Sequence, residues 1–150
     1  MIIREAKTED IEQLQFIRNS VKENALSNPN LVTYQDYETY INVKGKGWVC
    51  ELDNRIVGFA IVDLKENNIW ALFIAPEFER KGIGKALHDR MLEWYFMQTK
   101  EKVWLSTAFD TRAAKFYKIA GWTEVGMHGT KEVKFEMDYD DWKKRTANNR

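Results

Sequence analysis

The residues best suited to binding chemistry form a short basic loop, Arg80-Lys81-Gly82-Ile83-Gly84-Lys85. Its glycines carry no side chain that would keep a ligand from the backbone, and its cations supply positive charge. Residues 69–74 before the loop form an unbroken apolar run, and apolar residues recur at helical spacing after it. The loop is therefore predicted to join a buried strand to a helix N-terminus, where unpaired backbone amides favour an anion. We expect a phosphate or pyrophosphate there.

The spacing of the glycines excludes the two commonest phosphate-binding motifs. A P-loop needs four residues between its glycines and then Lys followed by Ser or Thr. Here a single residue separates Gly82 from Gly84, and Ala86 follows Lys85. A dinucleotide fingerprint needs a third glycine three residues after Gly84, and that position is Leu87. The bland alternative is that the two glycines merely shorten a strand-to-helix turn.

Length and composition indicate a globular protein without a bias towards polyanions. The 150 residues suit a single domain, residues 1–150, with a charged tail from about residue 139 that frays at its end. Lys plus Arg equals Asp plus Glu at 23 each, so no net field favours nucleic acid or a membrane surface. The lone Cys50 excludes an internal disulfide and is expected to serve packing. Without a signal-like N-terminus or an apolar membrane span, a cytoplasmic location is expected.

Apolar periodicity and turn signals predict the elements around the loop. Helices are expected to start near residues 10, 33, 83 and 110. Strands are expected at residues 1–6, 48–52, 55–64, 69–74, 102–107, 122–127 and 132–137. Most neighbouring strands are joined by short turns and should be antiparallel, whereas residues 102–107 follow a helix and can lie parallel to residues 69–74.

Local signals refine these elements. Thr33 and Asp36 have the spacing of a capping box, and Asp53-Asn54 suits a two-residue hairpin turn. Asp110 is expected to cap the fourth helix. Its predicted inward face consists of Ala113, Phe116, Tyr117 and Ala120.

The glycine loop resembles the coenzyme A-binding motif of the GNAT superfamily of acyl-CoA N-acyltransferases. That motif reads Gln/Arg-x-x-Gly-x-Gly/Ala after a strand ending x-x-Pro-Glu, and Gly82 and Gly84 match its glycine positions. Two positions depart from it, because Glu79 stands at the Gln/Arg position and Arg80 where a glycine is frequent. A carboxylate beside a pyrophosphate is unfavourable unless it turns away or pairs with a cation.

Residues 110–122 resemble the second GNAT signature, Asn-x-x-Ala-x-x-x-Tyr-x-x-x-Gly-Phe. Ala113, Tyr117 and Gly121 match in register, with Asp110 replacing Asn and Trp122 replacing Phe. The two motifs follow each other in the family's order, so the resemblance covers nearly the whole chain. It implies an α/β (α+β) fold of GNAT type, with a mixed, mostly antiparallel central sheet and helices on both faces.

The resemblance also implies an activity and a set of site residues. The activity is transfer of an acetyl group from acetyl-CoA, a co-substrate used without a metal, to a primary amine in a ternary complex. The residues implied for cofactor binding are Phe73, Ile74, Arg80, Lys81, Gly82, Ile83, Gly84, Lys85, Ala86, Asp110 and Ala113. Family members often carry a bulge near the first two, where a backbone amide would stabilise the oxyanion.

The tyrosine at the Tyr117 position commonly lies near the coenzyme A sulfur in this family. A phenol with a pKa of about 10 is protonated at neutral pH and can donate to a departing thiolate. The alternative is that Tyr117 is a core aromatic whose hydroxyl bonds elsewhere. Without turnover, the chain would be a non-catalytic acyl-CoA-binding module, and a binding protein for another phosphorylated ligand is a further rival.

The acceptor is predicted to be a small-molecule or peptide amine rather than nucleic acid or a membrane. The first two helices and their loop resemble the acceptor wall of GNAT enzymes, so Arg18, Glu23, Asn24, Tyr34 and Tyr37 could contact the acceptor. The general base stays open: Glu23 and Glu66 could act through water, His88 is expected at the surface, and His128 lies near the last hairpin. Dimerisation is common in the family, which allows a homodimer.

Overall fold

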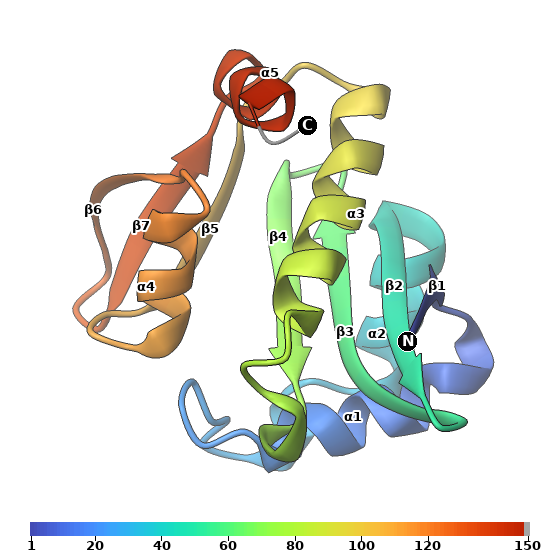
Figure 1. Cartoon of the computed structure of the whole chain (residues 1–150). Coiled ribbons are helices and arrows are strands. Elements are labelled where there is room, and N and C mark those ends of the chain that lie inside the picture. Colours follow the sequence, from blue (N-terminus) through green and yellow to red (C-terminus); the bar gives the residue numbers. More distant parts are fainter. Residues whose placement is uncertain (149–150) are drawn as a thin grey trace. The chain divides into compact units, whose positions relative to one another are not determined.

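A computed structural model describes residues 1–148 of the chain, which divides into two compact units, Met1–Tyr95 (unit 1) and Phe96–Arg150 (unit 2). Figure 1 labels the elements. Unit 1 contains β1 (Ile2–Glu5), α1 (Ile11–Ser20), α2 (Tyr34–Thr39), β2 (Gly45–Leu52), β3 (Arg55–Asp63), β4 (Asn68–Ile74) and most of α3 (Ile83–Gln98). Unit 2 contains β5 (Val103–Ala108), α4 (Arg112–Ile119), β6 (Thr123–His128), β7 (Glu132–Met137) and α5 (Tyr139–Asn148). The single domain expected from the length stays a prediction.

Unit 1 is an antiparallel sheet in the order β1-β2-β3-β4 with helices on both faces (Figure 1). Strand β3 is its centre, because every residue after Arg55 is buried. Residues Ile11, Leu14 and Ile17 of α1 join the core on one face. On the other face α3 packs so closely that a Cβ on Gly58 would lie 3.2 Å from Leu87 Cδ1 and 3.3 Å from Ile83 Cγ2.

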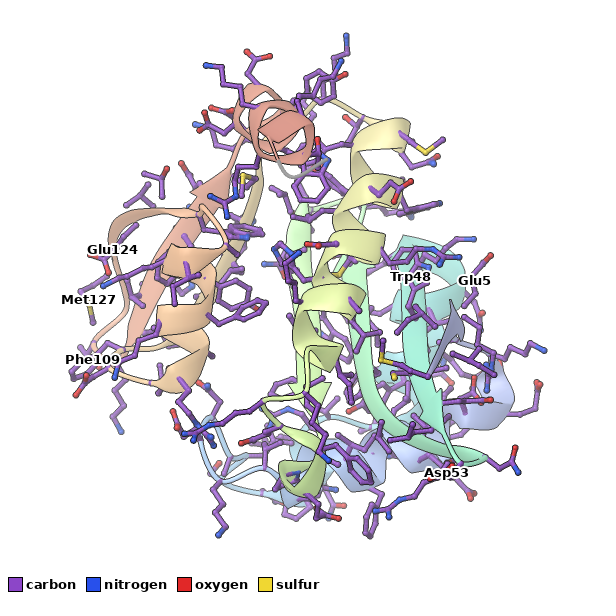
Figure 2. The ribbon with its side chains drawn as sticks, viewed as in Figure 1. Glu5, Trp48, Asp53, Phe109, Glu124 and Met127 are labelled. Atoms are coloured by element: carbon purple, nitrogen blue, oxygen red, sulfur yellow. The ribbon has the colours of Figure 1, made fainter. Side chains whose placement is uncertain are left out.

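The turns of unit 1 follow the local sequence signals. Asp53 and Asn54 both have positive φ, 53° and 64°, as a two-residue hairpin turn of the primed type requires. Asp53 lies at the tip of this hairpin (Figure 2). The Thr33 hydroxyl accepts from the Asp36 amide (3.1 Å) and the Asp36 carboxylate accepts from the Thr33 amide (2.8 Å), which confirms the predicted capping box.

Unit 2 is an antiparallel sheet in the order β5-β7-β6. Leu105 of β5 lies opposite Phe135 of β7, and both are buried. Tyr117 of α4 packs on this layer, with its ring centroid 6.1 Å from that of Phe135. Strand β6 is exposed along its whole length, and its Glu124 and Met127 project into solvent (Figure 2).

Two local predictions for unit 2 are wrong. Thr111, not Asp110, caps α4: its hydroxyl accepts from the Ala114 amide (3.2 Å), whereas Asp110 has a left-handed φ of 58° one residue earlier. With the cap shifted, Ala114 is buried in place of Ala113, which is half-buried. The charged segment from residue 139 is helical as α5, and its Trp142 packs on Phe96 (6.2 Å between ring centroids). The frayed end predicted for residues 149–150 lies outside the described residues.

An ion-pair network fastens β1 to the start of α1. The Arg4 guanidinium donates to both carboxylate oxygens of Asp10, at 2.8 and 2.9 Å, and to Glu51 at 2.8 Å. Asp10 also accepts from the Lys7 amide (2.8 Å). The hydrogen bond from Arg4 is the main cause that lowers the pKa of the buried Asp10 carboxyl, although burial opposes it.

We expect this network to make the fold sensitive to acid. Because the folded-state pKa of Asp10 lies below its unfolded value, its contribution to stability is present above about pH 4 and is lost as the pH falls through the folded-state pKa. Asp10→Asn should lower the free energy of unfolding at neutral pH by about 1.5–3 kcal/mol and should flatten its decline in acid. Urea unfolding at a series of pH values measures both effects. Glu9→Gln, at an exposed acid of the same turn, is the control and should leave the acid limb unchanged.

Candidate functional site

The connection from β4 to α3 has the backbone of an anion site. Arg80 and Gly82 both have left-handed φ values, 63° and 81°. A Cβ on Gly82 would meet no atom within 4 Å, so the space beside this backbone is open. The Ala86 amide donates to the Gly82 carbonyl (3.1 Å) and closes the first turn of α3. The amides before Ala86 have no partner within the helix and are available to an anion.

Arg80 occupies a conformation that glycine adopts without cost. An L-residue in the left-handed region is destabilised by about 1 kcal/mol, so a glycine would be the more stable choice here. Arg80 and Lys81 are both exposed and add positive charge beside the open backbone. A strained cation beside a helix N-terminus is consistent with a charge-dependent ligand contact.

The first turns of α3 differ from the sequence expectation at His88. Its side chain is 2% exposed, and its Nδ1 lies 2.9 Å from Asp89 Oδ1, so the predicted surface position is wrong. Lys85 forms an ion pair with the other oxygen of Asp89 (2.6 Å). Burial opposes ionisation of Asp89, but hydrogen bonds from His88 and Lys85 hold the pKa of its carboxyl below the usual value. The charge of Lys85 is therefore partly offset by Asp89.

The C-terminal end of β4 pairs regularly with β3 up to the predicted cofactor residues. Phe73 lies opposite Phe59, and Ile74 opposite Gly58. The irregularity in this pairing lies at Trp70, earlier in β4 than the bulge that the family resemblance implies. The Trp70 ring stacks on Tyr40 with 4.1 Å between centroids. The ladder next to Phe73 therefore has no bulge on its β3 side.

The predicted acceptor residues fall into two groups. Arg18, Tyr37 and Phe73 are brought together: the Arg18 guanidinium lies 4.2 Å from the Phe73 ring centroid, and Tyr37 affects the pKa of Arg18. Tyr37 is 1% exposed, and burial raises the pKa of its phenol to about 12. Tyr34 is 41% exposed on α2, and Glu23 is exposed in the loop after α1.

Two aromatic residues beside this group, Trp70 and Tyr40, were not predicted from the sequence. Trp70 contacts both Tyr40 and Tyr37, the latter at 5.2 Å between ring centroids. The available signal was the spacing of Tyr34, Tyr37 and Tyr40, which places three rings at successive helical turns. The rings of Tyr37, Tyr40 and Trp70 pack with Phe59 and Phe73 in the core on the α2 side of the sheet, whereas Tyr34 is exposed.

Unit 2 holds the remaining predicted residues. Tyr117 is 6% exposed among Phe116, Trp122 and Phe135, and burial raises the pKa of its phenol. Asp110 is exposed in the turn before α4. The contributions of these residues to catalysis and cofactor binding stay predictions.

The other titratable candidates have identifiable surroundings. Glu66 lies in the β3–β4 turn, where its amide donates to Asp63 Oδ1 (3.1 Å). His128 is exposed on β6, with its ring 5.4 Å from that of Trp104. Cys50 is fully buried, and burial raises the pKa of its thiol, as suits a packing residue. Within residues 1–148, no three His, Cys, Asp or Glu side chains are grouped to hold a metal ion, and no helix has the length and apolarity to cross a membrane.

Residues 9–122 match the model of the acetyltransferase (GNAT) family. The chain is similar in structure to the PaiA N-acetyltransferase of Thermoplasma acidophilum in complex with coenzyme A, with 16% identity, a TM-score of 0.77 and coverage of 92% of this chain and 98% of that chain. It is also similar to an N-acetyltransferase from Staphylococcus aureus Mu50, with 18% identity, a TM-score of 0.74 and coverage of 91% of this chain and 97% of that chain. A third similar structure is the ribosomal-protein-alanine N-acetyltransferase from Brucella melitensis, with 19% identity, a TM-score of 0.74 and coverage of 92% of this chain and 99% of that chain. At these identities the likeness establishes the fold, which confirms the mixed, mostly antiparallel α/β architecture predicted from the sequence.

We expect a side chain at Gly82 to block the anion site without disturbing the fold. Gly82→Asn introduces a residue that tolerates positive φ and fills the open space beside the loop. The affinity for coenzyme A, measured by calorimetry, should fall at least about tenfold because the pyrophosphate can no longer approach the amides. Gly129→Asn is a matched control, since Gly129 also has positive φ (73°) and no atom within 4 Å of a Cβ. Equal affinities of the two variants for coenzyme A would show that Gly82 is not part of the anion site.

Proposed function

Because this chain belongs to the acetyltransferase (GNAT) family, we propose that it transfers an acetyl group from acetyl-CoA to a primary amine by direct attack in a ternary complex. The observation that carries the proposal is the start of α3. There, unpaired amides, the open space at Gly82 and the exposed cations Arg80 and Lys81 combine. This set of donors and charges suits a pyrophosphate, the most highly charged part of the proposed co-substrate.

The proposal assigns the cofactor to residues of both motifs. The pyrophosphate would bind the backbone of Gly82, Ile83 and Gly84, with Arg80 and Lys81 as counter-charges. Pantetheine would lie along Phe73 and Ile74 at the end of β4. Lys85, Ala86, Asp110 and Ala113 complete the proposed set. Tyr34 and Glu23 are proposed on the acceptor side.

In the proposed reaction the amine nitrogen bonds to the acetyl carbon, the carbon–sulfur bond breaks, the amine loses a proton and the sulfur gains one. We assign donation towards the sulfur to the Tyr117 phenol. Burial raises the pKa of this phenol, so it is protonated throughout the neutral range. Since the pKa of a thiol is roughly 8.5, below that of the phenol, Tyr117 acts mainly by donating a hydrogen bond as negative charge develops on sulfur. The base is not assigned, and the cytoplasmic location and homodimer stay predictions.

Ligand-dependent stability and turnover test this function in sequence. Acetyl-CoA should raise the melting temperature of the protein, whereas ATP and NAD should not. A panel of small-molecule and peptide amines should then yield free thiol together with acetylated product detected by mass. Stabilisation without turnover by any amine would favour the non-catalytic binding module. Absence of stabilisation by acetyl-CoA would contradict both functions.

Tyr117→Phe tests the assigned hydrogen-bond donor. The change removes one oxygen and keeps the ring, so kcat should fall by about 10²-fold while the affinity for acetyl-CoA changes little. Because the pKa of Tyr117 is raised, the wild-type rate should show no decline from phenol ionisation below about pH 10.

The matched control is Tyr95→Phe. Tyr95 is also buried, and its hydroxyl donates to Asn67 Oδ1 (2.9 Å), so its loss should lower the melting temperature without lowering kcat per folded molecule. Equal, small effects of both substitutions on kcat would leave Tyr117 as a packing residue.

A further inference from the structure

Arg18 of α1 has a hydrogen-bond donor without an acceptor, beside the aromatic ring of Phe73. Its Nη1 is buried and has no hydrogen-bond partner among the described residues. The guanidinium lies over the Phe73 ring, 4.2 Å from the centroid. A buried donor without an acceptor destabilises a protein, so such atoms are rare unless something else satisfies them.

Other arginines of unit 1 show what satisfies a guanidinium in this fold. Arg4 donates to Asp10 and Glu51. Arg55 also lies over an aromatic ring, that of Phe78 at 5.2 Å, and still pairs with Glu77 at 3.2 Å. Both of these arginines pair with carboxylates, and in Arg55 stacking on a ring does not replace that partner.

The surroundings of Arg18 suit an anion. Burial lowers the pKa of Arg18, and the neighbouring Tyr37 phenol opposes this shift. An arginine stays charged in spite of such a shift. The Phe73 ring covers the guanidinium, and its Nη1 is buried, which strengthens the attraction of this nitrogen for a negative partner.

We infer that the amine acceptor carries a carboxylate and that Arg18 binds this carboxylate through its unpaired Nη1. The inference rests on the proposed function, which puts the pantetheine arm of acetyl-CoA along Phe73, the ring that Arg18 covers. A planar guanidinium matches a carboxylate with two parallel hydrogen bonds and discriminates strongly against a neutral amide. Free amino acids and short peptides with a terminal carboxylate share this chemistry.

Paired acceptors measure the preference. Wild-type kcat/KM should be at least about tenfold higher for amino acids or dipeptides than for their C-terminal amides. Amine ionisation cannot produce this result, because the amides have the less basic amines and expose more neutral amine at pH 7. The ratio of kcat/KM for the acid to kcat/KM for its amide is compared between amino acids and dipeptides. The larger ratio shows whether the preferred acceptor is a free amino acid or a short peptide.

Substitutions of Arg18 assign that preference to its side chain. Arg18→Gln should reduce the acid-to-amide ratio to near one, and Arg18→Lys should restore part of it, with KM for acetyl-CoA unchanged in both. Arg55→Gln removes an arginine that also covers a ring and should keep the wild-type ratio. A ratio that persists in Arg18→Gln would overturn the inference.

Binding of the product class tests the inference without turnover. N-acetyl amino acids should bind the wild-type protein at least about tenfold tighter than N-acetyl amino acid amides in calorimetry, and Arg18→Gln should remove the difference. This result in a protein that acetylates no amine would support the carboxylate site and contradict the proposed function. Acetylation of amines with no carboxylate preference in either measurement would overturn the inference and leave the function standing.

Discussion

Burial of β3 on both faces is the constraint on which unit 1 depends. Apolar residues of α1 and α2 cover one face, and α3 covers the other at contact distance over Gly58. This close approach fixes the N-terminus of α3 against the sheet. The conformation of the glycine loop is fixed with it, from the end of β4 at Ile74 to Ile83. A binding site made of backbone amides needs such a rigid support, because its donors cannot be re-aimed by side-chain rotation.

Two arginines on the α1 side of the same sheet use charge in opposite ways. Near β1, the Arg4 guanidinium is fully engaged by Asp10 and Glu51, and this network holds the first helix in place. Near the end of β4, Arg18 retains an unpaired buried nitrogen over Phe73. A network in which every hydrogen-bonding group has a partner makes a fold more rigid. A buried group without a partner lowers stability but leaves a donor that a ligand can use. The contrast separates a structural arginine from one available to a ligand.

Local sequence signals predicted the features that local physics decides. The turn at Asp53-Asn54 and the strand–loop–helix at Gly82 depend on neighbouring residues and were found. The burial of His88 was not predicted. A helix packed flat on a sheet buries a wider stripe of side chains than the apolar residues at helical spacing that start at Ile83. The unmet nitrogen of Arg18 depends on which side chains fold around it, and no spacing in the sequence encodes that.

The position of the single thiol has a consequence for measuring local opening. Cys50 lies on β2 between Ile3 of β1 and Gly58 of β3, with no exposed surface and a raised pKa. Alkylating reagents attack the thiolate, so modification requires separation of these strands. The alkylation rate in native buffer therefore reports the free energy of opening the β1–β2–β3 edge, and no cysteine needs to be engineered for the purpose. Released coenzyme A can likewise be quantified with a thiol reagent, because the folded protein contributes no competing thiol.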